Sequence, residues 1–229
     1  MLLRQLIRKT KHLAPNLRAM SSQGPLVDLS IDNDGVSIMT LQRPPSSPTV
    51  FSAGLDIMEM YKPDFKRAEE FWKTLQDMYL KLFGSSFITA AAINGHAPAG
   101  GCLISISTEY RVMVGGKFSI GLNETALGIV APNWFMDTYS HTIPVGLIDE
   151  VASDKADAIA KCKAFIGKFN RISPVARAIT KQKMRETVLK NFNDRREKDL
   201  QEFLGFIKNP QVQQSLEIYI QSLKKKAAN

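Results

Sequence analysis

The sequence predicts an α/β protein with a helical C-terminal region, and three observations support this class. The segment that begins at Val27 has the pattern of a β-hairpin. The middle of the chain alternates strand-like apolar runs with glycine-containing turns and helical patterns, and the C-terminal part carries helical patterns only. Strands that alternate with helices are typical of a parallel sheet covered by helices. A length of 229 residues suffices for one well-packed domain.

The hairpin and the first helix are predicted from the spacing of their apolar residues. Apolar side chains alternate over residues 27–31 and 36–41, on either side of Asp34-Gly35, which is a common hairpin turn. From Asp64 to Gly84 the apolar residues recur every three or four positions, which indicates an amphipathic helix.

The middle of the chain predicts strands followed by turns and helices. Residues 87–96 read as a buried strand that ends at Asn94-Gly95. Residues 99–113 are predicted as a helix, although their β-branched residues suit a strand equally well. A strand and then a loop are predicted over 117–132, and a short strand and then a helix over 144–169.

Two further helices are predicted in the C-terminal part. Ser173 and Pro174 are a typical N-cap and first residue for a helix that runs to Phe192. The last helix follows Pro210 and carries one apolar stripe, formed by Val212, Leu216, Tyr219 and Leu223.

The charges lie in blocks along the chain. Residues 1–27 carry five basic side chains and no acidic one, residues 28–160 have a net charge of −7, and residues 161–229 a net charge of +10. An arginine-rich, acid-free start is typical of a mitochondrial transit peptide, which we place at residues 1–26; a basic tail without that role is the alternative. Without this segment the net charge of the chain is only +3, and no aromatic residues lie among the basic side chains of the C-terminal block. Nucleic acid is therefore not an expected partner.

Composition excludes several other classes of protein. No apolar run reaches the roughly 18 residues that a membrane-spanning helix needs, so no integral membrane segment is expected. Cys102 and Cys162 match no zinc or redox spacing and read as free thiols. With only three histidines, of which His96 and His141 are expected to be structural, no metal site is predicted.

Two glycine-containing turns carry the first sign of chemistry. They are FSAGLD at residues 51–56 and PAGGC at residues 98–102. Glycine lets a backbone turn sharply at the end of a strand, so that the next amide points outward, and two such amides form an oxyanion hole. Each motif alone is more often a plain turn, and neither matches a nucleotide-binding fingerprint.

Glu124 is the third candidate. It lies among apolar residues in GLNETALGI, and burial raises the proton affinity of a carboxylate toward values that suit a general base. A glutamate that caps the turn after Asn123 is an equally good interpretation of the same pattern. The two alternatives stay open from the residues alone.

Together, FSAGLD, INGHAPAGGC and IGLNETALGIVAP resemble the three signature segments of the crotonase superfamily, and within it those of the mitochondrial enoyl-CoA delta isomerases. The resemblance extends from Val27 to the C-terminus. It implies a spiral of ββα units over residues 27–170 and a helical trimerisation region over 171–229. It also implies a homotrimer in the mitochondrial matrix that acts on acyl-CoA thioesters and needs no cofactor, because coenzyme A is part of the substrate.

The resemblance also assigns site residues. Position by position, the oxyanion-hole amides belong to Leu55 and Gly100, and Glu124 is the catalytic base. The remaining residues of the acyl-CoA site are then Ala53, Gly54, Asp56, Ile57 and Asn123. Trp72 and Trp134 are expected in the core or around the acyl pocket.

Leu103 decides which reaction the resemblance implies. Hydratases of the superfamily carry a second glutamate at this place to position water, whereas a single carboxylate suffices to move a double bond. The expected reaction is therefore the conversion of 3-cis- or 3-trans-enoyl-CoA to 2-trans-enoyl-CoA in the β-oxidation of unsaturated fatty acids. A hydratase is one alternative.

A catalytically impaired subunit that only binds acyl-CoA is the other alternative, because two stretches of the family pattern are missing here. One is the helix and strand that precede FSAGLD, and the other is a helical segment after residue 143. Without that strand the Leu55 amide loses support. Basic side chains at 181, 183, 185 and 224–226 are candidates for the coenzyme A phosphates, with a solvated helix face as the alternative.

Overall fold

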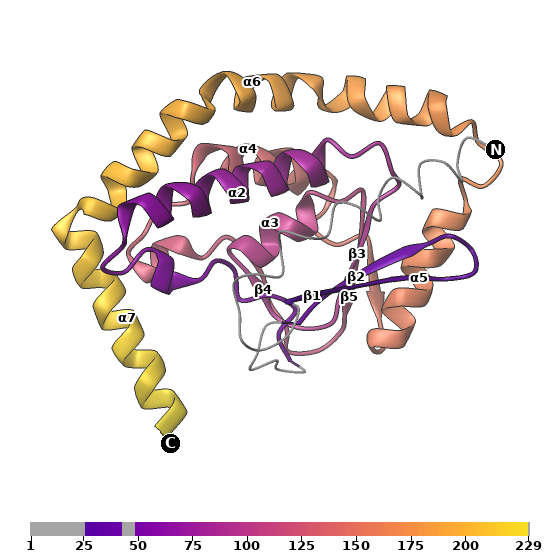
Figure 1. Cartoon of the computed structure of the whole chain (residues 1–229). Coiled ribbons are helices and arrows are strands. Elements are labelled where there is room, and N and C mark those ends of the chain that lie inside the picture. The colour runs from indigo at the N-terminus through magenta and orange to yellow at the C-terminus, as the bar shows by residue number, and fades with distance from the viewer. Residues whose placement is uncertain (1–25, 43–48, 229) are drawn as a thin grey trace. The chain divides into compact units, whose positions relative to one another are not determined.

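A computed structural model describes residues 26–42 and 49–228 and divides the chain into two units, residues 1–48 and 49–229, each described by itself. The predicted transit peptide lies almost wholly outside the described residues. In the first unit, β1 (Val27–Ile31) pairs antiparallel with β2 (Ser37–Leu41) (Figure 1). Gly35 has a φ of +80° in the turn, and the Asp32 carboxylate accepts the Val36 N–H at 2.9 Å. The predicted hairpin is confirmed.

The second unit alternates strands and helices and ends in helices only. Its elements are η1 (Ile57–Glu59), α2 (Phe65–Phe83), β3 (Ala90–Ile93), β4 (Ala97–Pro98), α3 (Gly100–Ile106), β5 (Tyr110–Val114), β6 (Ile120–Gly121), η2 (Glu124–Leu127), α4 (Asn133–Thr142), η3 (Ile143–Val145), β7 (Glu150–Ala152), α5 (Lys155–Gly167), α6 (Pro174–Lys208) and α7 (Pro210–Ala228), where η marks a 3-10 helix.

A parallel sheet of order β3-β5-β7 forms one side of this unit, and α5 packs on it. The helix predicted over 99–113 is therefore wrong in its second half. The helix ends at Ile106, and β5 pairs with β3 and β7, where Val112 is fully buried; between the two elements the Thr108 hydroxyl donates to the Tyr110 carbonyl at 3.1 Å. Of the β-branched residues of this stretch, Ile104 and Ile106 lie in α3, and Val112 lies in β5.

Side-chain caps define the long helices. Ser173 accepts the Ala176 N–H at 3.3 Å at the start of α6, which confirms the predicted N-cap. At the start of α2, Asp64 accepts the Arg67 N–H at 3.0 Å. α6 continues well past Phe192 to Lys208, and Figure 1 shows it running over α2 and α4 before α7 turns away. The sequence interpretation did not include α4, which begins directly after Pro132.

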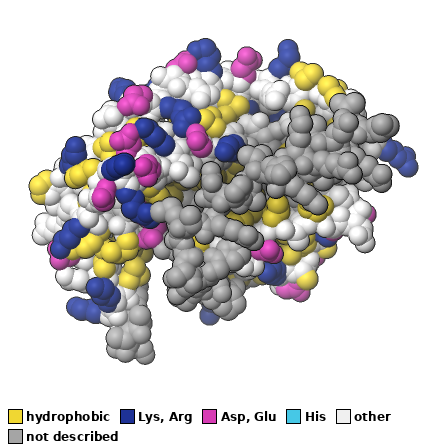
Figure 2. All heavy atoms as spheres, viewed as in Figure 1, with side chains coloured by type: hydrophobic (Ala, Val, Ile, Leu, Met, Phe, Trp, Pro, Cys, Tyr) yellow, Lys and Arg dark blue, Asp and Glu magenta, His cyan; other side chains and the backbone are white. Residues whose placement is uncertain are grey.

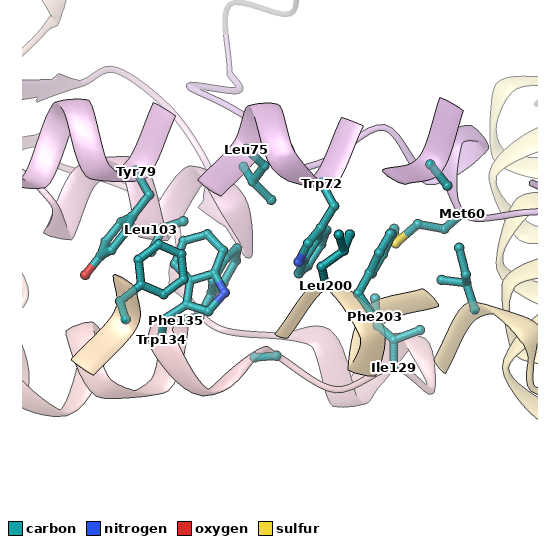
Figure 3. Close-up of a cluster of buried hydrophobic side chains, with 14 of the residues drawn as sticks. Met60, Trp72, Leu75, Tyr79, Leu103, Ile129, Trp134, Phe135, Leu200 and Phe203 are labelled. Atoms are coloured by element: carbon teal, nitrogen blue, oxygen red, sulfur yellow. The ribbon is translucent and has the colours of Figure 1, made fainter. Parts of the chain in front are cut away.

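The core of the second unit is a cluster of aromatic and aliphatic side chains between α2, α3, α4 and α6 (Figure 3). Trp72 stacks on Phe203 with ring centroids 3.8 Å apart, and the ring centroids of Trp134 and Tyr79 lie 4.7 Å apart. Both tryptophans are buried, so their predicted place in the core is confirmed. α7 contributes Val212 and Leu216 to the cluster; Leu223, predicted on the same stripe, is exposed.

Charges on the outer side of α6 are mixed in sign. Lys190 pairs with Asp194 and Lys198 with Glu202 at i, i+4 spacing, and Figure 2 shows basic and acidic side chains interspersed on this face. Among the helices that the structure describes, none is long and apolar enough to cross a membrane.

Candidate active site

Three backbone segments of the second unit run parallel and end at one place. Val50 forms a parallel bridge with His96, and β4, which follows His96, pairs in parallel with β6. The carboxyl ends of parallel neighbours meet at the same edge. Immediately beyond these three ends lie Leu55, Gly100 and Glu124. The three signature segments are therefore brought together by their backbones.

The segment before FSAGLD is held against His96. The His96 N–H donates to the Thr49 carbonyl at 2.8 Å, and the His96 carbonyl accepts the Phe51 N–H at 2.9 Å. A Cβ on Gly95 would lie 2.4 Å from the Thr49 carbonyl, so only glycine permits this approach. The expectation that the Leu55 loop has lost its strand support is thus only partly right, since one bridge remains.

The PAGGC turn is fixed from the other side by β6. Ala97 donates to the Ser119 carbonyl at 2.8 Å, and Ala99 donates to the Gly121 carbonyl at 2.9 Å. Ala99 has a φ of 51° and a ψ of −118°, a conformation that a residue with a Cβ rarely adopts. This strained residue turns the chain from β4 into α3, whose first residue is Gly100.

FSAGLD and PAGGC touch backbone to backbone at their glycines. Gly54 has a φ of +95°, and a Cβ on it would lie 3.1 Å from the Gly100 nitrogen. A Cβ on Gly100 would lie 3.4 Å from the Leu55 nitrogen. Within residues 26–42 and 49–228, neither the Leu55 amide nor the Gly100 amide donates a hydrogen bond. Two free amides therefore lie next to each other with no side chain between them.

Glu124 begins η2 just after β6 and is only 6% exposed. Neither of its carboxylate oxygens has a hydrogen-bond partner in the described part of the chain. Burial raises the pKa of Glu124, and the nearby amides of Glu124 itself and Asn123 offset this only in part. Glu124 is also the first residue of η2, directly after the N-cap residue Asn123, so the interpretation of a glutamate at the start of a turn stays open beside that of a general base.

The Glu124 carboxylate lies near the start of α3. Burial raises the pKa of the Cys102 thiol to about 12, and the negative charge of Glu124 adds to that shift. Cys102 stands two residues after Gly100 in the first turn of α3. An unpartnered, buried carboxylate beside free backbone amides can take up a proton whose removal leaves an oxyanion.

Comparisons with known proteins agree with this geometry. A family model described as enoyl-CoA hydratase/isomerase matches residues 45–145. The mitochondrial enoyl-CoA delta isomerase 1 of Mus musculus is 39% identical over 201 residues, which cover 78% of this chain and 69% of that protein. The protein of the same name from Rattus norvegicus is 38% identical, over 82% of this chain and 71% of that protein.

The chain belongs to the enoyl-CoA hydratase/isomerase family, the crotonase superfamily. Among solved structures, the human mitochondrial delta3-delta2-enoyl-CoA isomerase superposes with a TM-score of 0.83 and 29% identity, over 88% of this chain and 99% of that one. This match confirms the predicted crotonase-like α/β fold with its helical C-terminal region.

Leu103 occupies the position at which the hydratases of this family were expected to carry a second carboxylate. It is fully buried in the core cluster, and Figure 3 shows it at the same end as Tyr79, Trp134 and Phe135. This surrounding is apolar, so no charged group adjoins the PAGGC turn from that position. Glu124 is left as the single buried carboxylate of the three signature segments.

The other predicted substrate-binding residues differ in their surroundings. Ala53 and Asn123 are exposed, whereas Leu55 and Ile57 are half-buried and pack against the core cluster. Asp56 accepts the Met58 N–H at 3.0 Å and so caps η1. Four of the five residues 53–57 therefore lie at the boundary between the core and solvent, where a ligand can reach them.

Two of the basic residues considered for the coenzyme A phosphates are engaged inside the protein. Lys181 is 6% exposed and donates to Glu109 at 2.8 Å and to the Phe87 carbonyl at 2.7 Å. Arg185 donates to the Ser107 carbonyl at 3.1 Å and lies over the Phe83 ring. These side chains fasten α6 to the rest of the unit and are not available to a ligand, while Lys183, Lys224 and Lys225 are exposed.

Sequence interpretation missed one buried polar group close to this core. The Asp199 carboxylate accepts the indole N–H groups of Trp72 at 2.7 Å and Trp134 at 3.2 Å, and the Gln76 amide at 2.8 Å. Nothing in the pattern of α6, which is rich in charges of both signs, distinguishes this aspartate from its exposed neighbours.

His96, by contrast, was expected to be structural, and its Nδ1 accepts the Ser119 N–H at 3.1 Å between two site segments.

Proposed function

We propose that this chain catalyses the isomerisation of 3-cis- or 3-trans-enoyl-CoA to 2-trans-enoyl-CoA in the β-oxidation of unsaturated fatty acids. The observation that carries the proposal is the combination of two free, adjacent amides, at Leu55 and Gly100, with the buried and unpartnered carboxylate of Glu124. The named function of the mouse, rat and human relatives supports the same reaction.

The proposed mechanism uses one base and one oxyanion hole. The Leu55 and Gly100 amides bind the thioester oxygen, and Glu124 removes a proton from C2. The electron pair moves into the carbonyl to give a dienolate, whose negative charge the two amides stabilise by about 3 to 4 kcal/mol for each donor. Protonation at C4 by the same carboxyl group returns the electrons, places the double bond between C2 and C3, and regenerates the carboxylate.

The environment of Glu124 suits both steps. Because burial raises its pKa, the carboxylate is more basic than an exposed one and transfers its proton more readily to and from carbon near neutral pH. No side chain of the described residues donates a hydrogen bond to its oxygens, and only the amides of Asn123 and of Glu124 itself interact with them, which leaves the carboxylate able to face the substrate. Ala53, Gly54, Asp56, Ile57 and Asn123 are proposed to line the bound thioester.

Addition of water is not favoured, because it requires a second carboxylate and Leu103 stands at that place. A subunit that binds acyl-CoA without turnover is the second candidate. It is favoured by the single bridge at Val50 that holds the start of the FSAGLD segment, and by the exposure of Ile143 and Val145 at 51% and 77% where an acyl pocket would need a wall.

Location and assembly are part of the same proposal. We place the protein in the mitochondrial matrix, where the acyl-CoA substrate is oxidised, because the mouse, rat and human relatives are mitochondrial and because residues 1–26 have the composition of a transit peptide. A homotrimer with residues 171–229 at its interface remains a prediction from the family resemblance.

The test is an isomerase assay on the purified chain with 3-enoyl-CoA, in parallel with Glu124→Gln and with Glu186→Gln, an exposed glutamate of α6. The proposal expects turnover by the wild-type chain and by Glu186→Gln, and a loss of at least a hundredfold for Glu124→Gln. Binding of acyl-CoA without turnover would establish the second candidate instead. Activity that survives in Glu124→Gln would contradict the assignment of the base.

A further inference from the structure

Gln213, near the start of α7, makes contacts that reach into the candidate site. Its Nε2 group donates to the Met60 carbonyl at 2.8 Å and to the Ile207 carbonyl at 2.7 Å, and its Oε1 accepts the Lys62 N–H at 2.8 Å. Both amide hydrogens and one oxygen lone pair are therefore used. The side chain of Gln213 donates to the Met60 carbonyl and accepts the Lys62 N–H, which is the pair of bonds that the backbone of a neighbouring strand would form.

The segment that Gln213 holds is the direct continuation of the Leu55 loop. Glu59 N–H donates to the Asp56 carbonyl, and the N–H groups of Met60 and Tyr61 donate to the Ile57 carbonyl, each at 3.0 Å. Residues 56–61 thus form one hydrogen-bonded turn. A displacement of Met60 moves this turn, and with it the Leu55 amide at its start.

Lys62 has a strained backbone conformation that a tertiary contact must hold in place. Its φ of 48° is unusual for a residue with a side chain, and such a conformation persists only where surrounding bonds hold it. Within residues 49–228, the bond that its N–H forms is the one to Gln213. Gln213 therefore holds both the position and the conformation of the chain as it leaves the site.

The Leu55 loop is consequently fastened at its two ends by different parts of the chain. Pairing of Thr49 and Phe51 with His96 holds the start, through a single bridge. Gln213 holds the end. Between the two ends, Glu59 also accepts a hydrogen bond from Arg67 of α2 at 2.7 Å, so Gln213 shares the positional control over the Leu55 amide with this ion pair and with the short first anchor.

α7 also contacts the segment that carries Glu124. Gly128, the C-cap of η2, approaches Ser215 so closely that a Cβ would lie 2.6 Å from the serine Oγ. Met60 and Ile129 belong to one core cluster with Val212 and Leu216 of α7, and Figure 3 shows Met60 and Ile129 at the end of it that contains Phe203. The first two turns of α7 thus touch both the oxyanion segment and the base segment.

We infer that Gln213 is a positioning residue, which acts through Met60 and Lys62 to hold the Leu55 amide in the oxyanion hole. This inference rests on the proposed function for its catalytic consequence, but the anchoring itself does not depend on turnover. Gln213 does not contact the reacting atoms, so its replacement is expected to affect kcat through the position of the amide and not through chemistry of its own.

The test compares Gln213→Met with Gln214→Met. Methionine keeps the length and the helix propensity of glutamine but makes none of the three bonds. Gln214 is the exposed neighbour, and its side chain forms no hydrogen bond with the residues that the structure describes, so its variant controls for the substitution. Two readouts are measured below the unfolding temperature of each protein, namely kcat and KM for 3-enoyl-CoA, and hydrogen exchange of residues 56–61.

We expect Gln213→Met to exchange the amides of residues 59–61 about tenfold faster, and to lose about tenfold to a hundredfold in kcat with little change in KM, while Gln214→Met matches the wild type. Unchanged exchange in Gln213→Met would overturn the inference whether or not the protein turns over. Faster exchange with an unchanged kcat in an active enzyme would overturn it as well. Faster exchange in a chain with no wild-type turnover would support the anchor and overturn only the proposed function.

Discussion

Gly54 gives the sharpest single test of how the two amides are brought together. In Gly54→Ala, the new Cβ would lie 3.1 Å from the Gly100 nitrogen and 3.2 Å from the Ala99 Cβ, so the FSAGLD and PAGGC loops must separate by a few tenths of an ångström. The φ of +95° adds backbone strain of about 1 to 2 kcal/mol. We therefore expect a loss of stability of this size together with a loss of one oxyanion donor.

Gly116→Ala is the matched control, because Gly116 has a φ of +125° and a Cβ on it would meet nothing within 4 Å. Both variants are expected to lose about 1 to 2 kcal/mol in denaturant unfolding. Only Gly54→Ala is expected to lose about a hundredfold to a thousandfold in kcat for 3-enoyl-CoA, as removal of one oxyanion donor does. A folded Gly54→Ala with the kcat of Gly116→Ala would refute the assignment of the Leu55 and Gly100 amides.

Four further predictions concern three carboxylates, those of Glu124, Glu109 and Asp199. The raised pKa of Glu124 means that kcat/KM falls as pH is lowered through that pKa, which lies above the ordinary value of 4.5, and a pH–rate profile of the wild type will show this. Folding stability changes with pH in the opposite direction, because the raised pKa of Glu124 makes the protein less stable as the pH rises. The protonated form of Glu124 is favoured in the folded state, so Glu124→Gln is expected to be more stable than the wild type at pH 7 and equally stable near pH 4, as measured by denaturant unfolding. Burial opposes ionisation of Glu109, but bonds from Lys181 and Arg177 outweigh it and lower its pKa. Glu109→Gln is therefore expected to lose about 3 kcal/mol at pH 7 and progressively less as pH falls below 4.5, and an equal loss at all pH values would contradict the ion-pair explanation. Asp199→Ala removes the acceptor of two indole N–H groups and of one of the two Gln76 amide hydrogens, while Gln76 keeps its bond to the Arg196 carbonyl. The variant is expected to cost about 3 kcal/mol in thermal or denaturant unfolding, whereas a loss below about 1 kcal/mol would show that water replaces the carboxylate.

Local patterns in the sequence predicted most of the elements of this fold. The hairpin, α2 and the start of α6 follow from an Asp-Gly turn, from helical spacing and from the cap at Ser173, respectively, all of which act within a few residues. The second half of 99–113 was misassigned because its β-branched residues are compatible with both states. Pairing of β5 with β3 and β7 decides in favour of the strand, and that pairing is not local.

The candidate site likewise contains features that local sequence signals reveal and features that depend on contacts between distant residues. Local signals, namely glycine turns and an acid among apolar residues, drew attention to FSAGLD, PAGGC and Glu124, but their roles were assigned through the resemblance to the crotonase superfamily. The bridge at Val50 was not expected, and neither was Gln213, whose partners lie about 150 residues away in the chain. An exposed-looking glutamine in a polar helix carries no pattern that points to a distant turn.

The most direct test of the one-base mechanism is the fate of the proton at C2. Glu124 is 6% exposed, so a deuteron that it removes from C2-deuterated 3-enoyl-CoA exchanges slowly with water and is carried to C4. Mass spectrometry and NMR of the product are expected to show 2-trans-enoyl-CoA with deuterium at C4 in a substantial fraction of turnovers. A product that carries no deuterium at C4, or one that is hydrated at C3, would contradict the account.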